Sequence, residues 1–353
     1  RQVMRQGMLQ AIRQRLHDMP LPHVADNFGA YWREKLGDET FCATFIAPNV
    51  EWLKDWEVLK ENGVLPENSD LADRWVQRRM VWEVISEFGH ASRIGRTLER
   101  SGQATVAPDM DQLQRVSESI LTELRENIGE LRDIDARQLL QFLLGLLWRL
   151  RTRGAFYHDY LTSYIKNGGI PFMISRDWFM PAYGKARRPP AFLMMENKAR
   201  NFDFILGKQG TWYSQWFNKT LAGGDAVLAS AALEQAYRII LKHLEAAGFA
   251  RVMQHHGNDI WALQPERWAC TLQLAELACA GCGQRIQVPL MQVNHWQHSH
   301  CQRPSCIGVY SHCSPFTQTQ RHEKPPVRLI ASEHTGLLDP DTRLFIENSF
   351  KLG

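Results

Sequence analysis

Six of the seven cysteines in this chain of 353 residues lie between positions 270 and 313, and four of them form two short pairs. Two residues separate Cys279 from Cys282, and four residues separate Cys301 from Cys306. Zinc prefers four tetrahedrally arranged ligands, and two tight turns that each carry a pair of thiolates supply them. Because four protein ligands leave no coordination position for water, the pattern predicts a structural zinc ribbon over residues 267–324.

The residues alone leave the ligand set and the ion open. The second pair has an unusually wide spacing, and nearby donors could replace one of its thiolates: Cys313, His295, His298, His300 and His312. Four cysteines also bind iron–sulfur clusters, and reduced cysteines without any metal are a third interpretation. A zinc hydrolase is disfavoured, because it needs an open coordination position with an acid or base beside it, and the sequence has no HExxH motif.

A helix and a hairpin are expected immediately before the cysteines. Apolar residues recur at helical spacing over residues 226–247, and Gly248 stands where a left-handed helix end favours glycine. Two short apolar runs, 249–253 and 260–263, flank a polar turn and predict a β-hairpin. A helix followed by such a hairpin is typical of the end of a winged-helix domain, which we therefore expect over residues 225–266.

Winged helices bind DNA with a helix in the major groove and with the hairpin on the backbone. On that interpretation, five side chains of this region would contact phosphates: Arg238, Lys242, Arg251, His255 and His256. Winged helices also serve as structural spacers that do not contact nucleic acid. Both roles are compatible with the sequence of this region.

The net charge of +3 conceals a basic middle part of the chain. Residues 137–208 contain 12 lysines and arginines against 4 acidic residues, whereas residues 1–136 contain 17 against 23. A basic stretch rich in aromatic residues favours a polyanionic partner such as DNA, and Arg187 and Arg188 are candidate phosphate contacts. Its aromatic side chains could stack on the bases of a single strand or could form a core: Trp178, Phe179, Tyr183, Trp212, Tyr213 and Trp216.

The remaining residues predict the framework that positions these groups. Residues 1–153 place leucine and tryptophan residues at helical spacing and indicate a helical region. Glycines and prolines interrupt residues 154–224, which we expect to be a basic irregular linker. Short apolar runs within it, such as 172–174 and 191–194, could form strands. The predicted fold class is therefore mainly α with small β elements.

No segment of the sequence predicts a membrane span or a secretory signal. The longest apolar run, residues 139–150, is interrupted by polar residues and is shorter than the roughly 20 residues that a span needs. Clustered cysteines in an otherwise cysteine-poor chain indicate a reducing compartment, so we expect a cytoplasmic protein with no membrane partner. Because the chain begins with Arg1 and stops at Gly353, we interpret it as an internal piece of a longer protein.

The carboxyl-terminal residues carry a resemblance to a known family. A short β-rich run after two prolines leads into EHTGLL and then into a segment of helical spacing that ends in FKLG. This string resembles the start of the second RecA-like domain of superfamily 2 helicases, an α/β domain that we accordingly expect to begin within residues 325–353. The matching residues are His334, Gly336, Leu337, Arg343, Glu347, Phe350 and Gly353.

The order of shorter motifs is similar to that of the large DEAD/DEAH-box helicases of bacterial anti-phage systems such as Druantia, and of related bacterial repair helicases. The matching pieces are RTLE at 96–99, LRTRGAF at 150–156, IWAL at 260–263, CIGVY at 306–310 and EHTGLL at 333–338. Two features of the family are missing, because the sequence has neither a GxxxxGK[ST] phosphate loop nor a DEAD/DEAH box.

The resemblance implies an ATP-dependent parent helicase whose other lobes bind ATP and magnesium. This segment would then bind DNA and act as a scaffold between the motor lobes, without hydrolysing ATP by itself. Its expected partners are DNA, the remaining lobes of the parent chain and, in an antiviral defence system, further subunits of that system. The competing interpretation is a non-enzymatic zinc-ribbon and winged-helix adaptor that binds nucleic acid.

Overall fold

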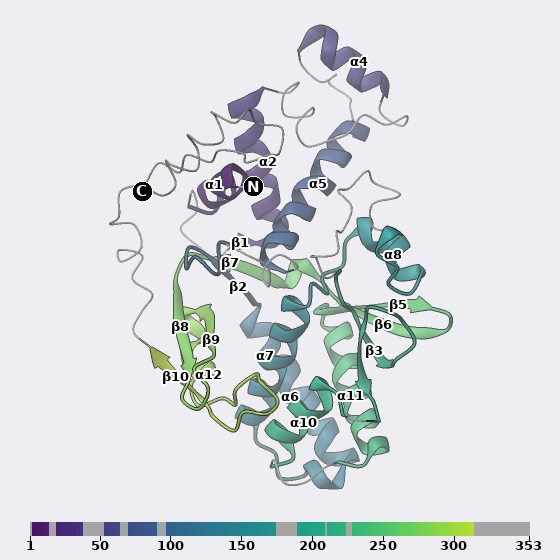
Figure 1. The fold of residues 1–353 in the computed structure, drawn as a ribbon, viewed down its shortest axis with the longest axis vertical. Helices are drawn as coiled ribbons and strands as arrows, with labels where there is room; N and C mark the ends of the chain where they lie inside the picture. Colours follow the sequence, from purple (N-terminus) through teal and green to yellow (C-terminus); the bar gives the residue numbers. More distant parts are fainter. Residues whose placement is uncertain are drawn as a thin grey trace, which may run out of the picture. The chain divides into compact units, whose positions relative to one another are not determined.

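The computed structural model describes residues 2–13, 19–37, 53–63, 70–89, 97–173, 189–208, 210–223 and 228–313. The chain divides into two compact units, Arg1–Phe316 and Thr317–Gly353, and all described residues belong to the first. About half of the described residues are helical, and three small sheets accompany the helices in this part of the chain (Figure 1). Helices with small β elements are what the sequence indicates. The RecA-like start expected at 325–353 lies outside the described residues.

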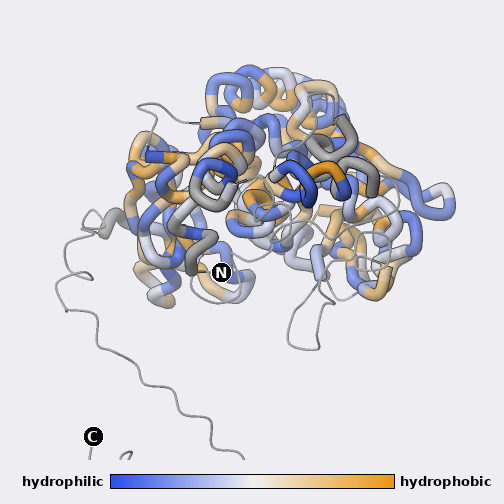
Figure 2. Tube along the Cα trace, turned by 90° about the horizontal axis from the view of Figure 1, so that it is seen from above, coloured by the Kyte–Doolittle hydropathy of each residue, from blue (hydrophilic) through white to orange (hydrophobic). Residues whose placement is uncertain are grey.

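Four helices are described in the amino-terminal part: α1 (Gln2–Arg13), α2 (Leu21–Leu36), α4 (Leu53–Asn62) and α5 (Asp70–Phe88). α2 contacts both α1 and α5. Its buried residues recur at helical spacing and so share one side of the helix; they are Leu21, Val24, Ala25 and Phe28. Figure 2 shows apolar and polar residues alternating along the described helices.

Two further helices begin at defined caps. Before α6 (Met110–Asn127), Asp109 Oδ1 accepts a hydrogen bond from the N–H of Gln112 at 3.1 Å. Before α7 (Ala136–Thr152), Asp135 and Gln138 exchange hydrogen bonds in a capping box. These side chains satisfy backbone N–H groups that the first turn of a helix leaves without partners.

α7 lies at the centre of the helical core. Most of its residues are buried, and it contacts α6, α10 (Trp212–Leu221) and α12 (Val293–Trp296). The apolar run at 139–150 is therefore a buried helix. Within the described residues, no helix combines the length and the apolar character needed to cross a lipid bilayer.

The expected helix and hairpin are present at 230–263. α11 (Ser230–Ala246) is followed by the antiparallel strands β5 (Ala250–His255) and β6 (Asn258–Leu263). The turn between them has positive φ at both central residues, 48° at His256 and 74° at Gly257. Such a type I′ turn matches the twist of the paired strands, so a two-residue connection is sufficient.

The hairpin belongs to a larger mixed sheet. β6 pairs antiparallel with β3 (Leu193–Glu196), and β3 pairs in parallel with β4 (Asp203–Leu206), which gives the order β4-β3-β6-β5. The expectation of an irregular linker over 154–224 is corrected by these strands and by α8 (Thr162–Lys166) and α10. The apolar runs between the glycines and prolines are buried and form core: Ala191, Phe192, Leu193, Met194 and Ile205.

Two three-stranded sheets complete the described part. β7 (Trp268–Thr271) lies between β1 (Met19–Pro20) and β2 (Thr105–Pro108). The other sheet has the order β10-β8-β9, in which β8 (Leu274–Cys279) pairs antiparallel with both neighbours. The flanking strands are β9 (Arg285–Pro289) and β10 (Tyr310–Cys313). This second sheet positions the paired cysteines, and it is called the ribbon below.

Candidate metal centre

The four paired cysteines meet beside the turn between β8 and β9. The Sγ atoms of Cys279, Cys282, Cys301 and Cys306 all lie within 4.8 Å of one another. The Sγ–Sγ distance is 3.6 Å between Cys279 and Cys306, and 3.6 Å between Cys282 and Cys301. A zinc ion bound at about 2.3 Å to four tetrahedral sulfurs would space them about 3.8 Å apart. The group therefore has the size of a four-thiolate zinc site.

The first pair lies on a tight turn. Cys279 ends β8, its N–H donates to the carbonyl of Gln284 at 2.8 Å, and its carbonyl accepts from the N–H of Gly283 at 2.9 Å. The N–H of Gly281 donates to Cys279 Sγ at 3.4 Å. Because an N–H directed at sulfur favours the thiolate, this turn prepares Cys279 to bind a cation.

The second pair lies on the loop that leads into β10. The N–H of Arg303 donates to Cys301 Sγ, and the N–H of Gly308 donates to Cys306 Sγ, both at 3.4 Å. In each case the donor lies two residues beyond its cysteine, as Gly281 lies two residues beyond Cys279. The wider spacing of the second pair thus preserves the N–H-to-sulfur arrangement of the first.

The two loops approach each other so closely that one position requires glycine. A Cβ atom at Gly308 would lie 2.7 Å from Cys279 Sγ and 2.7 Å from the backbone nitrogen of Gly281. Both distances are too short for non-bonded atoms, so any side chain at position 308 would push the loops apart. The absence of a side chain there brings the two cysteine pairs within reach of one ion.

The thiols differ in how readily they lose a proton. Burial raises the pKa of Cys279, but the backbone N–H groups of Cys282 and Gly281, together with hydrogen bonds from the Cys306 and Cys301 thiols, outweigh burial and lower it to about 7. Burial raises the pKa of Cys301 to about 12, although the N–H of Arg303 opposes the shift. Neighbouring thiolates repel one another, so a divalent ion is what allows all four to ionise, and its binding would release protons.

The alternative ligands whose side chains are described do not join this group. Among the side chains that the structure describes, the four cysteines are the group that could hold a metal ion. His295, His298 and His300 are described and do not belong to it. The side chains of His312 and Cys313 lie outside the description.

Two residues of α10 also reach the second loop, a contact that the sequence does not predict for either of them. Lys219 Nζ donates to carbonyl oxygens of this loop, and Trp212 Nε1 donates to the carbonyl of Gln302 at 2.8 Å. Lys219 is separated from Cys301 by 82 positions, and Trp212 from Gln302 by 90. No local pattern marks either residue, because their role comes only from tertiary packing.

Two residues predicted to contact DNA lie on α11, and both have acidic neighbours. Lys242 Nζ lies 3.3 Å from a carboxylate oxygen of Glu123 on α6, and Arg238 pairs with Glu234 on the same helix at 2.7 Å. The apolar side of α11 packs against α6 and β5. The outer side therefore carries acids as well as bases, unlike the basic surface expected of a helix in a DNA groove.

The predicted contacts on the hairpin occupy different environments. His255 is buried, and its Nδ1 lies 2.8 Å from the carbonyl of Lys166. Because it is buried, its side chain cannot contact a phosphate. Arg251 lies over the ring of Tyr157, with its Cζ 4.2 Å from the ring centre. His256 is exposed at the turn. The other two candidates, Arg187 and Arg188, lie outside the described residues.

The aromatic residues of α10 form core and do not offer bases a stacking surface. Tyr213 and Trp216 are buried, and Trp212 stacks on Trp216 with ring centres 5.6 Å apart. The guanidinium of Arg149 covers Trp212 at 5.0 Å from the ring centre. The remaining stacking candidates lie outside the described residues: Trp178, Phe179 and Tyr183.

Three of the short motifs meet in one place. Glu99 of RTLE and Arg151 of LRTRGAF are both buried, and two hydrogen bonds of 2.8 and 2.9 Å join their side chains. LRTRGAF is also bonded to IWAL, because the N–H of Leu263 donates to the carbonyl of Ala155 at 2.7 Å. These contacts join the turn at 97–105, the end of α7 and the hairpin.

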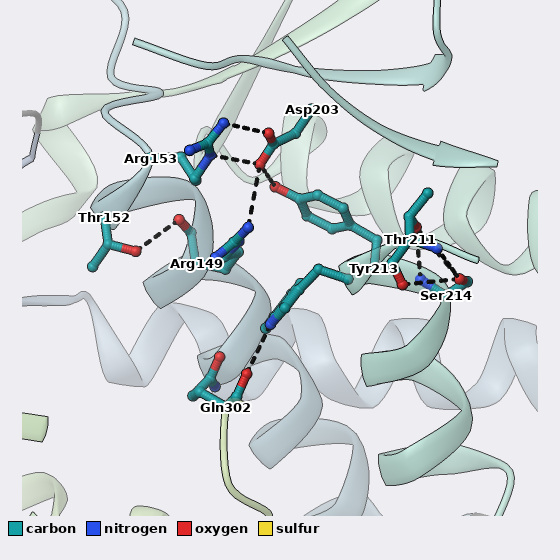
Figure 3. Close-up of polar contacts among 9 residues, drawn as sticks. Arg149, Thr152, Arg153, Asp203, Thr211, Tyr213, Ser214 and Gln302 are labelled. Atoms are coloured by element: carbon teal, nitrogen blue, oxygen red, sulfur yellow. Dashed lines mark hydrogen bonds and ion pairs between the residues drawn. The ribbon is translucent and has the colours of Figure 1, made fainter. Parts of the chain in front are cut away.

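The end of α7 is also tied to the mixed sheet and to α10. Arg153 donates to both carboxylate oxygens of Asp203 at 2.8 and 2.6 Å, and Tyr213 Oη donates to the same carboxylate at 3.0 Å (Figure 3). Arg149 Nη2 lies 3.9 Å from it. Asp203 thus connects α7, β4 and α10, and α10 in turn reaches the second cysteine loop.

The cysteine group and these junctions are the features of the described residues that bear most directly on function. Compared with protein-family models, with curated proteins and with solved structures, the chain finds no match.

Proposed function

We propose that this chain is an internal DNA-binding and scaffold segment of an ATP-dependent superfamily 2 helicase of the large bacterial anti-phage or repair type, with a structural zinc ion in its ribbon. The observation that carries the scaffold role is the closed group of four cysteine sulfurs. Four thiolates fill a tetrahedral shell and leave no position for water or substrate. Such an ion stabilises a fold and does not catalyse a reaction.

Zinc is the ion that we assign to this group. A tetrahedron of thiolates suits zinc, but four cysteines also hold iron–sulfur clusters. A cluster of several irons and sulfides would hold its cysteine sulfurs farther apart than a single ion does. The Sγ atoms here all lie within 4.8 Å of one another, which favours a single ion at their centre.

The helicase assignment comes from the motif resemblance, and contacts among the motifs support it. RTLE, LRTRGAF and IWAL are distant in sequence, but the Glu99–Arg151 pair and the Leu263–Ala155 hydrogen bond join them. A buried ion pair is costly unless further hydrogen bonds satisfy it, and Glu99 also accepts from Thr105 Oγ1 at 2.8 Å. We interpret this junction as the part that holds the helical region against the hairpin in the parent motor.

We assign the DNA contact to the end of the mixed sheet at the β5–β6 turn instead of the outer side of α11. Lys166, Arg200 and His256 are exposed. Their segments are adjacent. The N–H of Arg200 donates to the carbonyl of Gly168 at 3.1 Å, and the buried His255, next to His256, contacts the carbonyl of Lys166. Such a surface would bind phosphates without reading sequence, and its affinity would fall as salt rises.

Charge-reversal variants compare the two surfaces. We expect Lys166→Glu combined with Arg200→Glu to weaken DNA binding at least about tenfold at low salt. The slope of affinity against salt concentration should fall by the amount that about one phosphate contact contributes, for each lost cation. Arg238→Glu combined with Lys242→Glu changes the charge equally on α11 and should have the smaller effect. A larger loss in the α11 pair would restore the winged-helix interface, and unchanged affinity in both would remove the DNA role from these surfaces.

One observation also fits the adaptor function. The sequence contains neither a phosphate loop nor a DEAD/DEAH box. A zinc-ribbon and winged-helix adaptor would also lack both motifs. ATP hydrolysis by the complete parent protein separates the two functions. A motor should hydrolyse ATP faster when DNA is added, whereas an adaptor should not hydrolyse ATP at all.

A further inference from the structure

Lys219 lies where it can act on the cysteine site without being a ligand. It belongs to the last turn of α10, and its Nζ donates to the carbonyl oxygens of Cys301, Arg303 and Cys306 at 3.0, 2.8 and 2.7 Å. An ammonium group has three N–H donors and no acceptor. The second cysteine loop therefore uses every donor that Lys219 has.

The loop is bound from both ends of α10. Trp212, the first residue of the helix, donates to the carbonyl of Gln302 at 2.8 Å. Four of the six carbonyls from Cys301 to Cys306, counting both cysteines, thus accept hydrogen bonds from two side chains of α10. Two of these carbonyls belong to the cysteines themselves, so the bonds hold the backbone from which both sulfurs project.

This support matters most for the second loop. Four residues between paired cysteines leave the backbone more freedom than two, so ordering this loop costs more conformational entropy. The charge of Lys219 is also complementary to the site, because four thiolates carry more negative charge than a divalent ion neutralises. A nearby cation lowers the electrostatic cost of holding that excess charge in partly buried surroundings.

Building on the proposed zinc centre, we propose that Lys219 is a positioning residue of that centre. Its ammonium group holds the second cysteine loop in the binding conformation and offsets part of the thiolate charge, and it thereby sets the affinity for zinc. Groups that orient metal ligands from outside the coordination shell typically change metal affinity about 10- to 100-fold. A residue that only packed α10 against the ribbon would show no dependence on charge or on N–H donors.

The test is the zinc affinity of the purified full chain, measured by competition with a chromophoric chelator. We expect Lys219→Met, which keeps the aliphatic stem, to bind zinc about 10- to 100-fold more weakly than the wild type. Lys219→Gln keeps N–H donors without the charge and should fall between the two. Lys219→Arg keeps both and should stay closest to the wild type. Lys242→Met is the matched control, because Lys242 pairs with Glu123 on α6 and should leave zinc affinity unchanged.

Equal zinc affinity in the wild type and in Lys219→Met contradicts the inference. If Lys219→Met does not fold, Lys219→Gln decides: an affinity equal to the wild type overturns the inference, and a loss that Lys219→Arg does not show supports it. Cobalt substitution adds a second readout, since Lys219→Met should keep the absorption of a four-thiolate site once the ion is bound. A wild-type chain that binds no zinc contradicts the proposed centre itself, which distinguishes that failure from a failure of the role of Lys219.

Discussion

In the ribbon, the four cysteines selected by their spacing come together within 4.8 Å, whereas the basic residues selected in the helix and hairpin are dispersed. Lys242 pairs with Glu123, and His255 is buried against the carbonyl of Lys166. A pair of cysteines on a short turn constrains the backbone that carries it. A lysine on an amphipathic helix predicts only that its ammonium group reaches water, and it does not predict what that group contacts. Spacing within one turn therefore predicts a site more reliably than residue type along a helix.

Removing one ligand should have the largest effect, and the effect should stay within the ribbon. We expect Cys279→Ser to lose bound zinc and to lose protection from hydrogen exchange in β8, β9 and β10, because metal binding and folding are coupled at such sites. α11 and its hairpin should stay protected. Cys270→Ser changes a buried cysteine of β7 outside the group and should keep its zinc. Equal loss of protection in α11 would break the contrast between the two regions.

The buried ion pair should be next in size. Glu99→Ala would leave the guanidinium of Arg151 buried beside no carboxylate, and breaking a buried pair in this way costs about 3–5 kcal/mol. Glu234→Ala removes the exposed partner of Arg238, and such surface pairs contribute about 0.3–0.5 kcal/mol. Urea unfolding of both variants measures the difference. Similar losses in the two would show that the junction of RTLE and LRTRGAF does not hold the fold.

The close approach of the two cysteine loops predicts a smaller loss. Gly308→Ala would place a Cβ 2.7 Å from Cys279 Sγ, and the displacement should weaken zinc binding and lower the free energy of unfolding by about 1–3 kcal/mol. Gly129→Ala is the matched control, because a Cβ there meets nothing within 4 Å. Chelator competition and thermal unfolding report the two effects. A Gly308→Ala protein as stable as Gly129→Ala would mean that the loops separate without cost.

The smallest effect concerns the ion pairs between α11 and Glu123 of α6. The hydrogen bond from His243, more than burial or Lys242, shifts the pKa of Glu123, and the net shift is downward from 4.5. A carboxyl whose pKa is lower in the folded state contributes stability above its unfolded pKa. That contribution is lost as the pH falls through the lowered folded value.

We therefore expect the free energy of unfolding of the wild type to fall more steeply below about pH 4.5 than that of Glu123→Gln. Chemical denaturation at a series of pH values measures the difference between the two proteins. Identical pH profiles would show that Glu123 does not pair with His243 and Lys242. Both bases of α11 could then contact nucleic acid.

The sequence predicts the local features of this chain well. Apolar positions such as Leu113, Val116 and Ile120 mark the buried side of α6, and the polar turn at His256 and Gly257 marks the hairpin. In each case one short segment contains the whole signal. The cysteine group is a partial exception, because its two halves are local but their meeting depends on the sheet between them.

The features that the sequence does not predict depend on distant contacts. β3 pairs with β6 across more than fifty residues, and the apolar run around β3 does not identify that partner. Lys219 resembles any other lysine near a helix end until α10 is placed against the second loop. The resemblance at 325–353 and the candidates Arg187 and Arg188 remain predictions, because they fall outside the described residues.

X-ray absorption at the zinc edge, on protein purified under reducing conditions, tests the central claim most directly. We predict one zinc per chain with four sulfur neighbours at about 2.3 Å and no lighter ligand. A nitrogen or oxygen neighbour would contradict the closed four-thiolate shell, and a protein without zinc would contradict the metal centre as a whole.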